Sequence, residues 1–367
     1  MKLLVLSTDY PKKDESVALM YIHTRNKYYV QHDVDVTVLN FNANENYVLD
    51  GVKVITLTEY EKNKNHYDIL ISHAPNLRNH YLFLKKYDRN FSYIVFFFHG
   101  HEVLKVSEVY PKPYHYMKTS SKLSMITRNI YDVFKLKMWK RYFTKNISKS
   151  HFVFVSKWMY DMFLKFVQIN PEHINDKKHI IYNAIGEDFE KNYYDYRSKK
   201  EYDFITIRAN LDNSKYAIDI VTKIAAMNPK YKFCVVGRGA FYKYIRKPDN
   251  LIWIDKNLSH AEIIDLLNKS YCALLPTRTD SQGVMACELA TFGIPLITSN
   301  IDVCKEVFEG FNNVEYIDND AKEIDINSIY QKLVNRNNDE RERNNKYYAE
   351  NTIGKEIQLF KMILKSS

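Results

Sequence analysis

The stretch from Leu274 to Asn300 constrains the fold of this chain most. It reads LLPTRTDSQGVMACELATFGIPLITSN, which is an apolar segment, a polar loop, a helix that opens at Gly283, and a second apolar segment. Gly293 suits the left-handed end of that helix, and Pro295 cannot continue it. A loop and helix N-terminus that follow a parallel strand are a common place for α/β proteins to bind anions. The stretch therefore predicts a strand–helix–strand unit with an anion-binding loop.

Alternation of strands and helices extends over the whole chain. Strands are expected in the first half at Lys2–Ser7, Val34–Asn40, Gly51–Leu57, Asp68–Ser72, Tyr93–Phe98 and His151–Ser156. In the second half we expect strands at Asp203–Ile207, Lys232–Val236, Leu251–Ile254 and Tyr271–Leu275, and helices at Ser214–Met227 and Ser259–Lys269. Ser259 and Glu262 have the spacing of a capping box. This alternation predicts parallel sheets with helices on both faces.

The segment Gly186–Tyr202 separates two such halves. It is charged, tyrosine-rich and without hydrophobic periodicity, so we expect it to be a linker. The predicted fold class is therefore α/β, with a Rossmann-like domain at residues 1–185, a linker at 186–202 and a second Rossmann-like domain at 203–345. A chain of 367 residues is long enough for two such cores.

The composition excludes several functional classes. The 53 basic residues exceed the 44 acidic ones, which gives a net charge of +9. This moderate excess suits anionic ligands or an anionic membrane surface, but no zinc-finger, RRM or KH pattern points to nucleic acid. The four cysteines lack CxxC spacing and read as buried free thiols of a reducing compartment. No segment is apolar enough to span a bilayer, so a cytoplasmic location is expected.

The segment Lys118–Lys145 is both basic and aromatic. Its basic residues are Lys118, Lys122, Arg128, Lys135, Lys137, Lys140, Arg141 and Lys145, and Tyr131, Phe134, Trp139, Tyr142 and Phe143 lie among them. Such a helix can lie on an anionic membrane surface, with Lys137, Trp139, Lys140 and Arg141 as candidate membrane or acceptor contacts. The more common explanation is a helix with a solvated basic face and a core-facing aromatic stripe.

Three further features are weak signals on their own. Gly237-Arg238-Gly239 follows a strand but lacks the third glycine of a dinucleotide fingerprint. Arg208 and Lys215 follow the strand DFITI and together can hold a diphosphate, although such cations are more often ordinary surface charges. His99 ends the strand YIVFFF and is expected to point into a crevice, although loop histidines without a role are common. No HExxH, GxSxG or P-loop motif occurs.

Taken in order, several segments resemble the retaining, nucleotide-sugar-dependent glycosyltransferases of family 4, which have the GT-B fold. The strongest is Asp280 to Glu288, which resembles the E-x7-E motif of that family, and the helix and GIP turn that follow. Supporting segments are FFFHGHE, FVFVSKWMYDMFL, IIYNAIGEDFE, FITIRANLDNSKYAID, KFCVVGRG and YAENTIGKEIQLFKMIL. Departures are Asp280 in place of the first glutamate, Gln282 in place of an aromatic residue, and DYPKKDESV (Asp9–Val17) in place of a glycine-rich loop.

The resemblance implies a role for each matching residue. Glu288 would hold the ribose hydroxyls, Asp280 and His99 would lie near the donor sugar, and Arg208 and Lys215 would bind the diphosphate. The remaining donor-binding candidates are Gly237 and the positions where backbone N–H groups would meet the sugar and phosphates, namely Gln282, Gly283, Val284 and Met285. It also implies that the two domains face a central cleft and that the C-terminal helix, residues 346–367, packs back on the N-terminal, acceptor-binding domain.

The expected activity is therefore transfer of a hexose from a nucleotide-diphosphate sugar, with UDP favoured, to a glycan or lipid-linked glycan in bacterial surface polysaccharide synthesis such as capsule or lipopolysaccharide. The expected mechanism retains the anomeric configuration and needs no cofactor and no metal. Expected partners are the donor, the acceptor and an anionic surface at the inner face of the cell membrane, with no nucleic acid. Two alternatives stay open: a nucleotide-sugar epimerase on the same architecture, and a catalytically dead relative that docks at membranes or acts as a scaffold.

Overall fold

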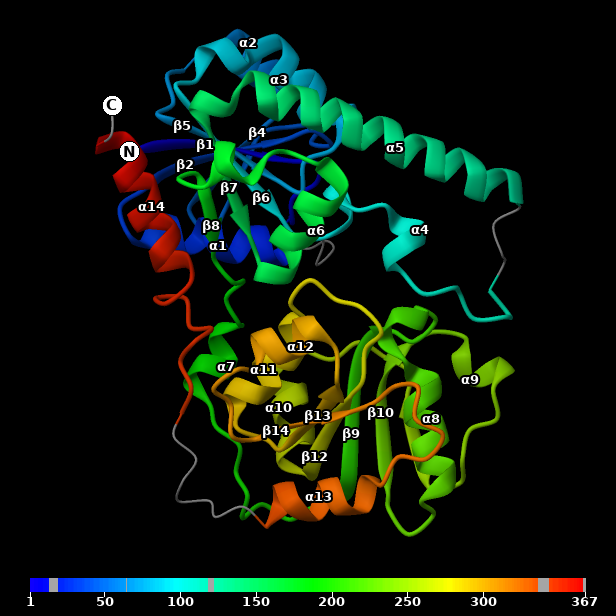
Figure 1. The fold of residues 1–367 in the computed structure, drawn as a ribbon. Helices are drawn as coiled ribbons and strands as arrows, with labels where there is room; N and C mark the ends of the chain where they lie inside the picture. Colours follow the sequence, from blue (N-terminus) through cyan, green and yellow to red (C-terminus); the bar gives the residue numbers. More distant parts are fainter. Residues whose placement is uncertain (13–18, 64, 118–121, 336–342, 366–367) are drawn as a thin grey trace. The chain divides into compact units, whose positions relative to one another are not determined.

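The chain folds into two compact units, each with its own sheet and core (Figure 1). The computed structural model describes residues 1–12, 19–63, 65–117, 122–335 and 343–365. Unit 1 comprises Met1–Val106, Arg128–Ala184 and Ala349–Ser367, and unit 2 comprises Ser107–Thr127 and Ile185–Tyr348. Most of the predicted loop Asp9–Val17 lies outside the described residues, as does Lys118. Within the described ranges, no helix is both long and apolar enough to cross a membrane.

Unit 1 is built on an eight-stranded sheet of order β3-β4-β2-β1-β5-β6-β7-β8, in which only β3 and β4 pair antiparallel. The strands are β1 (Lys2–Ser7), β2 (Asp35–Asn40), β3 (Tyr47–Leu49), β4 (Val52–Ile55), β5 (Ile69–His73), β6 (Tyr93–Phe98), β7 (Ser150–Phe154) and β8 (Lys178–Ile180). The central strands are apolar along nearly their whole length because helices cover both faces of the sheet.

The helices associated with this sheet include one from the end of the chain. They are α1 (Met20–Gln31), α2 (Leu57–Lys62), α3 (Leu82–Tyr87), α5 (Lys122–Lys145), α6 (Lys157–Val167) and α14 (Ile353–Lys365). The short helix α4 (Val106–Val109) falls almost entirely in unit 2, as do the first residues of α5 up to Thr127. Helix α14 packs Ile353, Ile357 and Phe360 into the core of unit 1. A buried ion pair also joins it to α1, since Arg25 Nε lies 3.0 Å from Glu356 Oε1.

Unit 2 has a fully parallel six-stranded sheet of order β11-β10-β9-β12-β13-β14. Its strands are β9 (Tyr202–Asn210), β10 (Phe233–Arg238), β11 (Leu251–Ile254), β12 (Ser270–Leu275), β13 (Leu296–Ser299) and β14 (Val314–Ile317). Its helices are α7 (Glu187–Lys191), α8 (Ile218–Met227), α9 (Phe241–Tyr244), α10 (His260–Asn268), α11 (Val284–Phe292), α12 (Asp302–Val307) and α13 (Ile326–Val334). The order is that of a Rossmann sheet, with its switch point between β9 and β12.

The predicted fold class, an α/β chain with two parallel-sheet domains, is confirmed. So is the capping box of α10, in which Ser259 and Glu262 bond reciprocally. The expected helix Ser214–Met227 was wrong at its start. There a 3-10 turn at Ser214–Tyr216 precedes α8, because Ala217 adopts a left-handed backbone at φ 52°. The strands β3 and β14 and the helix α7 within the expected linker were not predicted.

Candidate functional site

The carboxyl ends of β9, β10 and β12 bring the predicted residues of unit 2 to one edge of its sheet. Arg208 lies near the end of β9, Gly237 near the end of β10, and the loop Thr277–Gly283 follows β12. Because β10 and β12 flank β9 on opposite sides, the connections from these strands diverge here. A crevice at such a divergence is the usual ligand site of an open parallel sheet.

Arg208 lies at this edge of the sheet, and one of its N–H groups makes no hydrogen bond within the described residues. Its side chain is buried, and its Nη2 donates a hydrogen bond to the Pro276 carbonyl at 2.9 Å. Its Nε is also buried and has no hydrogen-bond partner among the described residues. Burial lowers the pKa of Arg208 from its usual value, and the negative charge of Asp280 opposes that shift. A buried guanidinium with an unpaired N–H is well suited to bind an anion.

Lys215 meets Arg208 at a shared aromatic ring. The Lys215 Nζ lies 4.7 Å and the Arg208 Cζ 4.8 Å from the ring centroid of Tyr216. The Lys215 carbonyl accepts hydrogen bonds from the Arg278 N–H at 2.8 Å and the Thr277 hydroxyl at 3.0 Å. Burial lowers the pKa of Lys215, but Asp280 and nearby tyrosines outweigh burial, so the pKa lies above its usual value. The structure thus brings together two cations that stand seven positions apart in the sequence.

Asp280 and the start of α11 form the other side of this cluster. The Asp280 Oδ1 accepts a hydrogen bond from the Ser281 N–H at 2.8 Å. Gly283 has a left-handed backbone at φ 76°, and a Cβ there would lie 3.3 Å from Asp280 Oδ2. Helix α11 then begins at Val284, so the N–H groups of Val284 and Met285 have no acceptor within the helix. These groups, with the partial positive charge of the helix start, favour an anion.

Gln282 stands in the same loop but turns its side chain inward. It is buried, and its amide Nε2 lies 3.8 Å from the sulfur of Cys287. The role predicted for Gln282 was contact of its backbone N–H with the sugar and phosphates, and the inward side chain does not conflict with that role.

Glu288 is a buried carboxylate in the second turn of α11. Its Oε1 accepts a hydrogen bond from the backbone N–H of Gly186 at 3.0 Å, and His260 Nε2 lies 4.0 Å from the same oxygen. Burial raises the pKa of Glu288 to about 7, while the hydrogen bond from Gly186 opposes the rise. A carboxyl group whose pKa lies near 7 is typical of a functional site.

Gly186 and His260 were not predicted as site residues. A Cβ on Gly186 would lie 2.5 Å from His260 Cε1 and 3.2 Å from Glu288 Oε1, so only glycine permits this approach. The sequence offered two signals for Gly186. The chain has only 9 glycines, so each is more informative, and Gly186 lies in the segment NAIGEDFE. Its contact with Glu288 spans 102 positions and has no local pattern.

Gly237 lies against Arg208. Its backbone is left-handed at φ 148°, and a Cβ would lie 1.9 Å from the Arg208 carbonyl oxygen. The Gly237 carbonyl accepts a hydrogen bond from the Trp253 indole at 2.9 Å. Gly237 therefore lets β10 pass close to the backbone of Arg208, and its contact with a donor stays a prediction.

His99 belongs to unit 1 and follows β6. Its Nε2 lies 3.1 Å from the Nδ1 of His73, and the Glu102 carboxylate accepts hydrogen bonds from the backbone N–H groups of His99 and Gly100 at 3.3 and 2.6 Å. Burial, and then the charge of Arg25, hold the pKa of His99 well below its usual value. His99 is therefore a neutral hydrogen-bonding group at pH 7. Neither His73 nor Glu102 was predicted to support it.

The membrane candidates on α5 separate into two groups. Lys137, Lys140 and Arg141 are exposed, but Trp139 is completely buried, with its ring 5.1 Å from that of Phe143. The prediction that Trp139 contacts a membrane or acceptor is therefore wrong, because this part of α5 turns its aromatic residues to the core. Among the described residues, no group of three or more His, Cys, Asp or Glu side chains could hold a metal ion.

Comparison with known proteins adds family and fold. The model of the family described as glycosyl transferases group 1 matches residues 189–352, which contain the cluster of unit 2. A search of curated proteins found no match.

Solved structures match the chain over nearly its whole length. Sucrose-phosphate synthase from Thermosynechococcus elongatus has a TM-score of 0.69 and 11% identity, with 100% of both chains covered. The structure named trehalose-6-phosphate from E. coli, bound with UDP-2-fluoro glucose, has a TM-score of 0.53 and 10% identity, and covers 100% of this chain and 96% of that one. WaaG, a glycosyltransferase involved in lipopolysaccharide biosynthesis, has a TM-score of 0.52 and 13% identity, with 91% and 90% covered.

At these identities the solved structures show the fold alone, and the family match covers most of unit 2. Residues 189–352 thus match the model of the glycosyl transferases group 1, and the chain as a whole has the fold of these solved structures.

Proposed function

We propose that this protein is a retaining glycosyltransferase that moves a hexose from a nucleotide-diphosphate sugar to a glycan or lipid-linked glycan. One observation carries the proposal: Arg208 and Lys215 meet at the ring of Tyr216, beside Asp280 and the start of α11. Breaking a glycosyl phosphate bond leaves negative charge on a diphosphate. Fixed cations and a helix N-terminus aimed at that charge lower the barrier.

In the proposed step, the bond between the anomeric carbon and the phosphate oxygen breaks as the acceptor hydroxyl oxygen bonds to the same face of that carbon. The acceptor proton passes to the departing phosphate oxygen. Arg208, through its unpaired Nε, and Lys215 would bind the departing diphosphate together with the N–H groups of Val284 and Met285. Because these groups compensate the developing charge, the proposed reaction needs no metal ion.

We favour UDP as the nucleotide. The E. coli structure of the same fold is bound with UDP-2-fluoro glucose. In this chain, the buried Glu288 is suited to accept hydrogen bonds from two ribose hydroxyls, and Asp280 would contact the sugar. His99, being neutral, would act by hydrogen bonding and not by charge.

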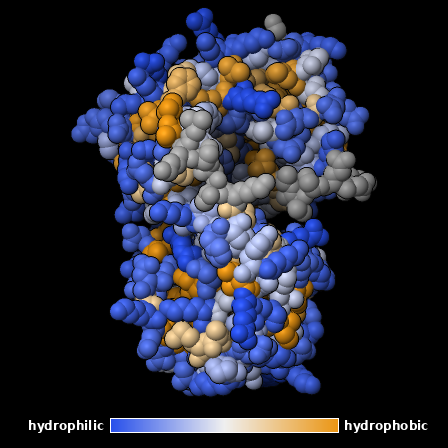
Figure 2. Space-filling view, turned by 90° about the vertical axis from the view of Figure 1, so that its right-hand side faces the viewer, coloured by the Kyte–Doolittle hydropathy of each residue, from blue (hydrophilic) through white to orange (hydrophobic). Residues whose placement is uncertain are grey.

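We further propose that the acceptor belongs to bacterial surface polysaccharide synthesis and that α5 docks on the inner face of the membrane. WaaG, which has this fold, is involved in lipopolysaccharide biosynthesis. The exposed apolar residues of α5 are Met125, Ile126, Ile130, Tyr131, Val133 and Phe134. Figure 2 shows that hydrophobic residues interrupt an otherwise largely hydrophilic surface.

The charges of α5 favour an anionic lipid surface as the partner. Arg128, Lys137, Lys140, Arg141 and Lys145 are exposed, whereas Asp132 is buried and pairs with Lys135 at 2.8 Å. Every exposed charge described on α5 is therefore positive. A helix with exposed apolar and basic side chains binds at the interface of anionic bilayers.

The transfer proposal is tested by incubating UDP-, GDP- and ADP-sugars with the protein and following them by NMR, with water as the acceptor. We expect slow release of one hexose, initially with the anomeric configuration of the donor. Arg208→Ala should lower this rate by about 10²- to 10³-fold, as for other groups that bind developing charge. Arg246→Ala removes an exposed arginine from the loop that precedes β11 and is the matched control, with an unchanged rate.

Two results would favour the alternative functions, an epimerase or a scaffold. Epimerisation of the donor without release of the sugar would favour the epimerase. Absence of binding by any nucleotide diphosphate in titration calorimetry, with Glu288→Ala indistinguishable from the wild type, would favour the scaffold.

Membrane docking is tested separately by sedimentation with liposomes of phosphatidylcholine alone or mixed with phosphatidylglycerol. We expect binding only to the anionic liposomes, and its loss when Ile130 and Phe134 are replaced by serine or when Lys137, Lys140 and Arg141 are replaced by glutamine. Equal sedimentation of the wild type and both variants would remove the membrane claim.

A further inference from the structure

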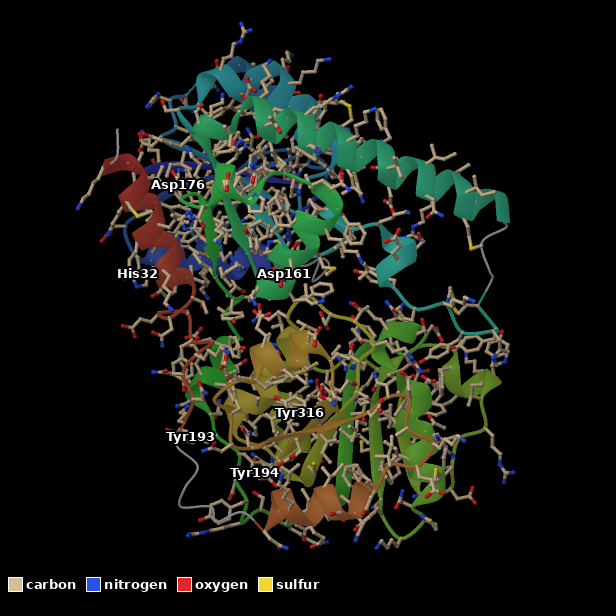
Figure 3. All side chains as sticks on the ribbon, in the orientation of Figure 1. His32, Asp161, Asp176, Tyr193, Tyr194 and Tyr316 are labelled. Carbon is tan, nitrogen blue, oxygen red and sulfur yellow. The ribbon has the colours of Figure 1, made fainter. Side chains whose placement is uncertain are left out.

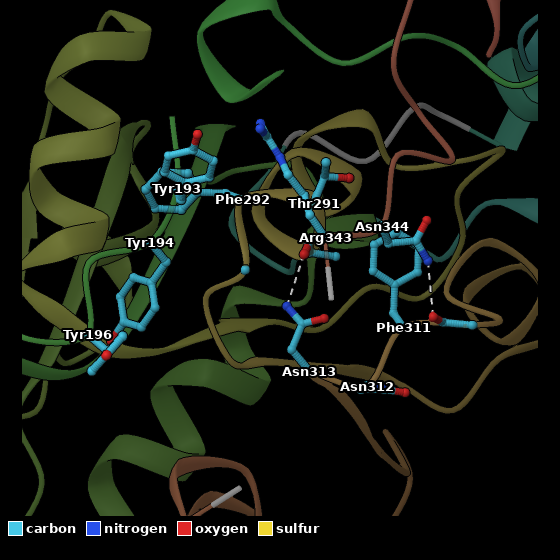
Figure 4. A pocket seen from close by; sticks show the side chains of 13 residues that line it. Tyr193, Tyr194, Tyr196, Thr291, Phe292, Phe311, Asn312, Asn313, Arg343 and Asn344 are labelled. Atoms are coloured by element: carbon cyan, nitrogen blue, oxygen red, sulfur yellow. Dashed lines mark hydrogen bonds between the residues drawn. The ribbon is translucent and has the colours of Figure 1, made fainter. Parts of the chain in front are cut away.

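A cavity of about 340 Å³ lies in unit 2 at the end of α11 that is remote from Gly283 (Figure 4). Helix α11 has nine residues, so about 13 Å of helix separates this cavity from the anion-binding start of the helix. Thr291 and Phe292, at the end of α11, line the cavity. It is therefore distinct from the candidate donor site, although both are built on the same helix.

The walls of the cavity combine aromatic rings with amide groups. The rings belong to Tyr193, Tyr194, Tyr196, Phe292 and Phe311, and the amides to Asn312, Asn313 and Asn344. In Figure 4 the rings of Tyr194 and Tyr196 lie on one side and that of Phe311 on the other, with Thr291 and Asn313 between them. Figure 3 shows Tyr193 and Tyr194 next to each other at the edge of unit 2.

Tyr194 and Asn313 are fixed in the cavity wall by hydrogen bonds to the backbone. The Tyr194 N–H donates to the Phe292 carbonyl at 2.8 Å, and its hydroxyl donates to the Ser270 carbonyl at 2.8 Å. Asn313 Nδ2 donates to the carbonyls of Ala290 and Ile294 at 2.9 and 2.8 Å. Such preorganised walls reduce the entropy cost of binding.

One polar group that lines the cavity has no partner. The Thr291 side chain is only 4% exposed, and its hydroxyl has no hydrogen-bond partner among the described residues. Threonine hydroxyls in helices commonly donate to the carbonyl one turn earlier, and this one does not. An unsatisfied hydroxyl in a residue that lines a cavity calls for an explanation, and a polar ligand bound in the cavity is one.

The only charged side chain that lines the cavity within the described ranges is Arg343. Its guanidinium lies 4.7 Å from the ring of Tyr193 and 4.9 Å from that of Tyr348. Since none of the described lining residues is acidic, the described part of the cavity suits a neutral or anionic ligand better than a cationic one.

We propose that this cavity is a second carbohydrate-binding site, for a neutral or acidic sugar unit of a glycan. A pyranose ring presents apolar C–H faces that pack on aromatic rings, and hydroxyls that bond to amides, guanidinium and the Thr291 hydroxyl. Binding at this site does not depend on the proposed transfer reaction. Its use, to hold a glycan acceptor or product while the start of α11 holds the donor, rests on the proposed function.

The test is saturation-transfer NMR with the methyl glycosides of glucose, N-acetylglucosamine and glucuronic acid, in saturating UDP so that the nucleotide site is filled. We expect at least one glycoside to bind. Tyr193→Ala should weaken it about tenfold, the size expected for loss of one aromatic contact. Tyr244→Ala is the matched control, since Tyr244 is similarly exposed, at 61% against 66%, and does not line the cavity.

Thr291→Val separates binding from structure. It preserves the shape of the side chain and removes the hydroxyl, so binding should weaken about tenfold while the melting temperature stays the same or rises, because the lost group was unsatisfied. Donor hydrolysis by Tyr193→Ala should stay at the wild-type rate, which keeps this test independent of the transfer proposal. Failure of all three glycosides to bind, or binding that Tyr193→Ala and Thr291→Val leave unchanged, would overturn the inference.

Discussion

The buried carboxylate of Glu288 and the backbone N–H of Gly186 are joined by a hydrogen bond of 3.0 Å. Glu288 lies on α11, and Gly186 immediately precedes α7, so this contact fixes the start of the segment between the sheets to the helix of the candidate donor site. Burial raises the pKa of Glu288 to about 7, which places its titration within the physiological range.

Binding of UDP should therefore release a proton near pH 6.5. Below pH 7 the unliganded Glu288 is mainly protonated, and ribose hydroxyls that donate to it favour the ionised form. Affinity for UDP should fall by up to about tenfold for each unit of pH below 7. Titration calorimetry in imidazole and Bis-Tris buffers, which are not anionic and differ in ionisation heat, measures the released protons. Glu288→Gln should show no such release, and proton uptake by the wild type would contradict the assignment.

The same pKa predicts the sign of a stability change. In the folded protein Glu288 titrates at about 7, above its ordinary value of 4.5, so its protonated form stabilises the fold fully below pH 4.5. That contribution is lost as the pH rises through 7, at a cost of roughly 3 kcal/mol. The melting temperature of Glu288→Gln relative to the wild type should therefore increase from pH 5 to pH 8. A constant difference over this range would show that Glu288 does not titrate there.

Gly186→Ala should disturb the site through contact with two side chains. The added Cβ would lie 2.5 Å from His260 Cε1 and 3.2 Å from Glu288 Oε1, so the hydrogen bond from Gly186 must lengthen. We expect UDP affinity to fall about tenfold or more, as for loss of one hydrogen bond to a charged group. The matched control is Gly354→Ala in α14, where the nearest atom would lie 3.6 Å away. It should be neutral or stabilising, by up to about 1 kcal/mol. Equal UDP affinity of Gly186→Ala and the wild type would show that the hydrogen bond is dispensable.

The ion pair between Arg25 and Glu356 should be essential to unit 1 as a pair. Both side chains are buried, and Tyr29 also donates to Glu356, while Arg25 Nη2 donates to Asn183 at 2.8 Å. Glu356→Leu alone should destabilise unit 1 by about 3–5 kcal/mol, because Arg25 is left buried without its partner. Arg25→Met combined with Glu356→Leu should recover a large part of that loss, and denaturant unfolding measures both. A double variant no more stable than Glu356→Leu would refute the pairing argument.

Much of the fold was predictable because buried parallel strands have continuous apolar sequences. The segments Lys2–Ser7, Tyr93–Phe98 and Leu251–Ile254 match their strands to the residue. The short strands β3 and β14 were missed because they lie at sheet edges and are only partly buried, so they lack the long apolar sequence of a central strand. The break at Ala217 was missed because nothing in an alanine predicts a left-handed backbone.

The sequence predicted several residues of the candidate site but not the contacts between them. The resemblance to a family located Arg208, Lys215, Asp280 and Glu288, and the structure brings the first three together in unit 2. Their roles stay predictions. The bond of Gly186 to Glu288 depends on tertiary packing that no local pattern encodes. Trp139 was wrongly predicted to be exposed. Basic and aromatic residues are mixed along α5, and the sequence does not show which of the aromatic side chains pack into the core.

The place of α14 in the core of unit 1 sets an order for folding during synthesis. Unit 1 begins at Met1 but also requires Ala349–Ser367, which the ribosome adds after the whole of unit 2. Domains generally fold as units as they emerge. Unit 2, complete by Tyr348, is therefore able to fold before unit 1, which starts first and finishes last. Until then, the core of unit 1 lacks the apolar face of α14, so the apolar side chains that this face covers have no partner on the nascent chain.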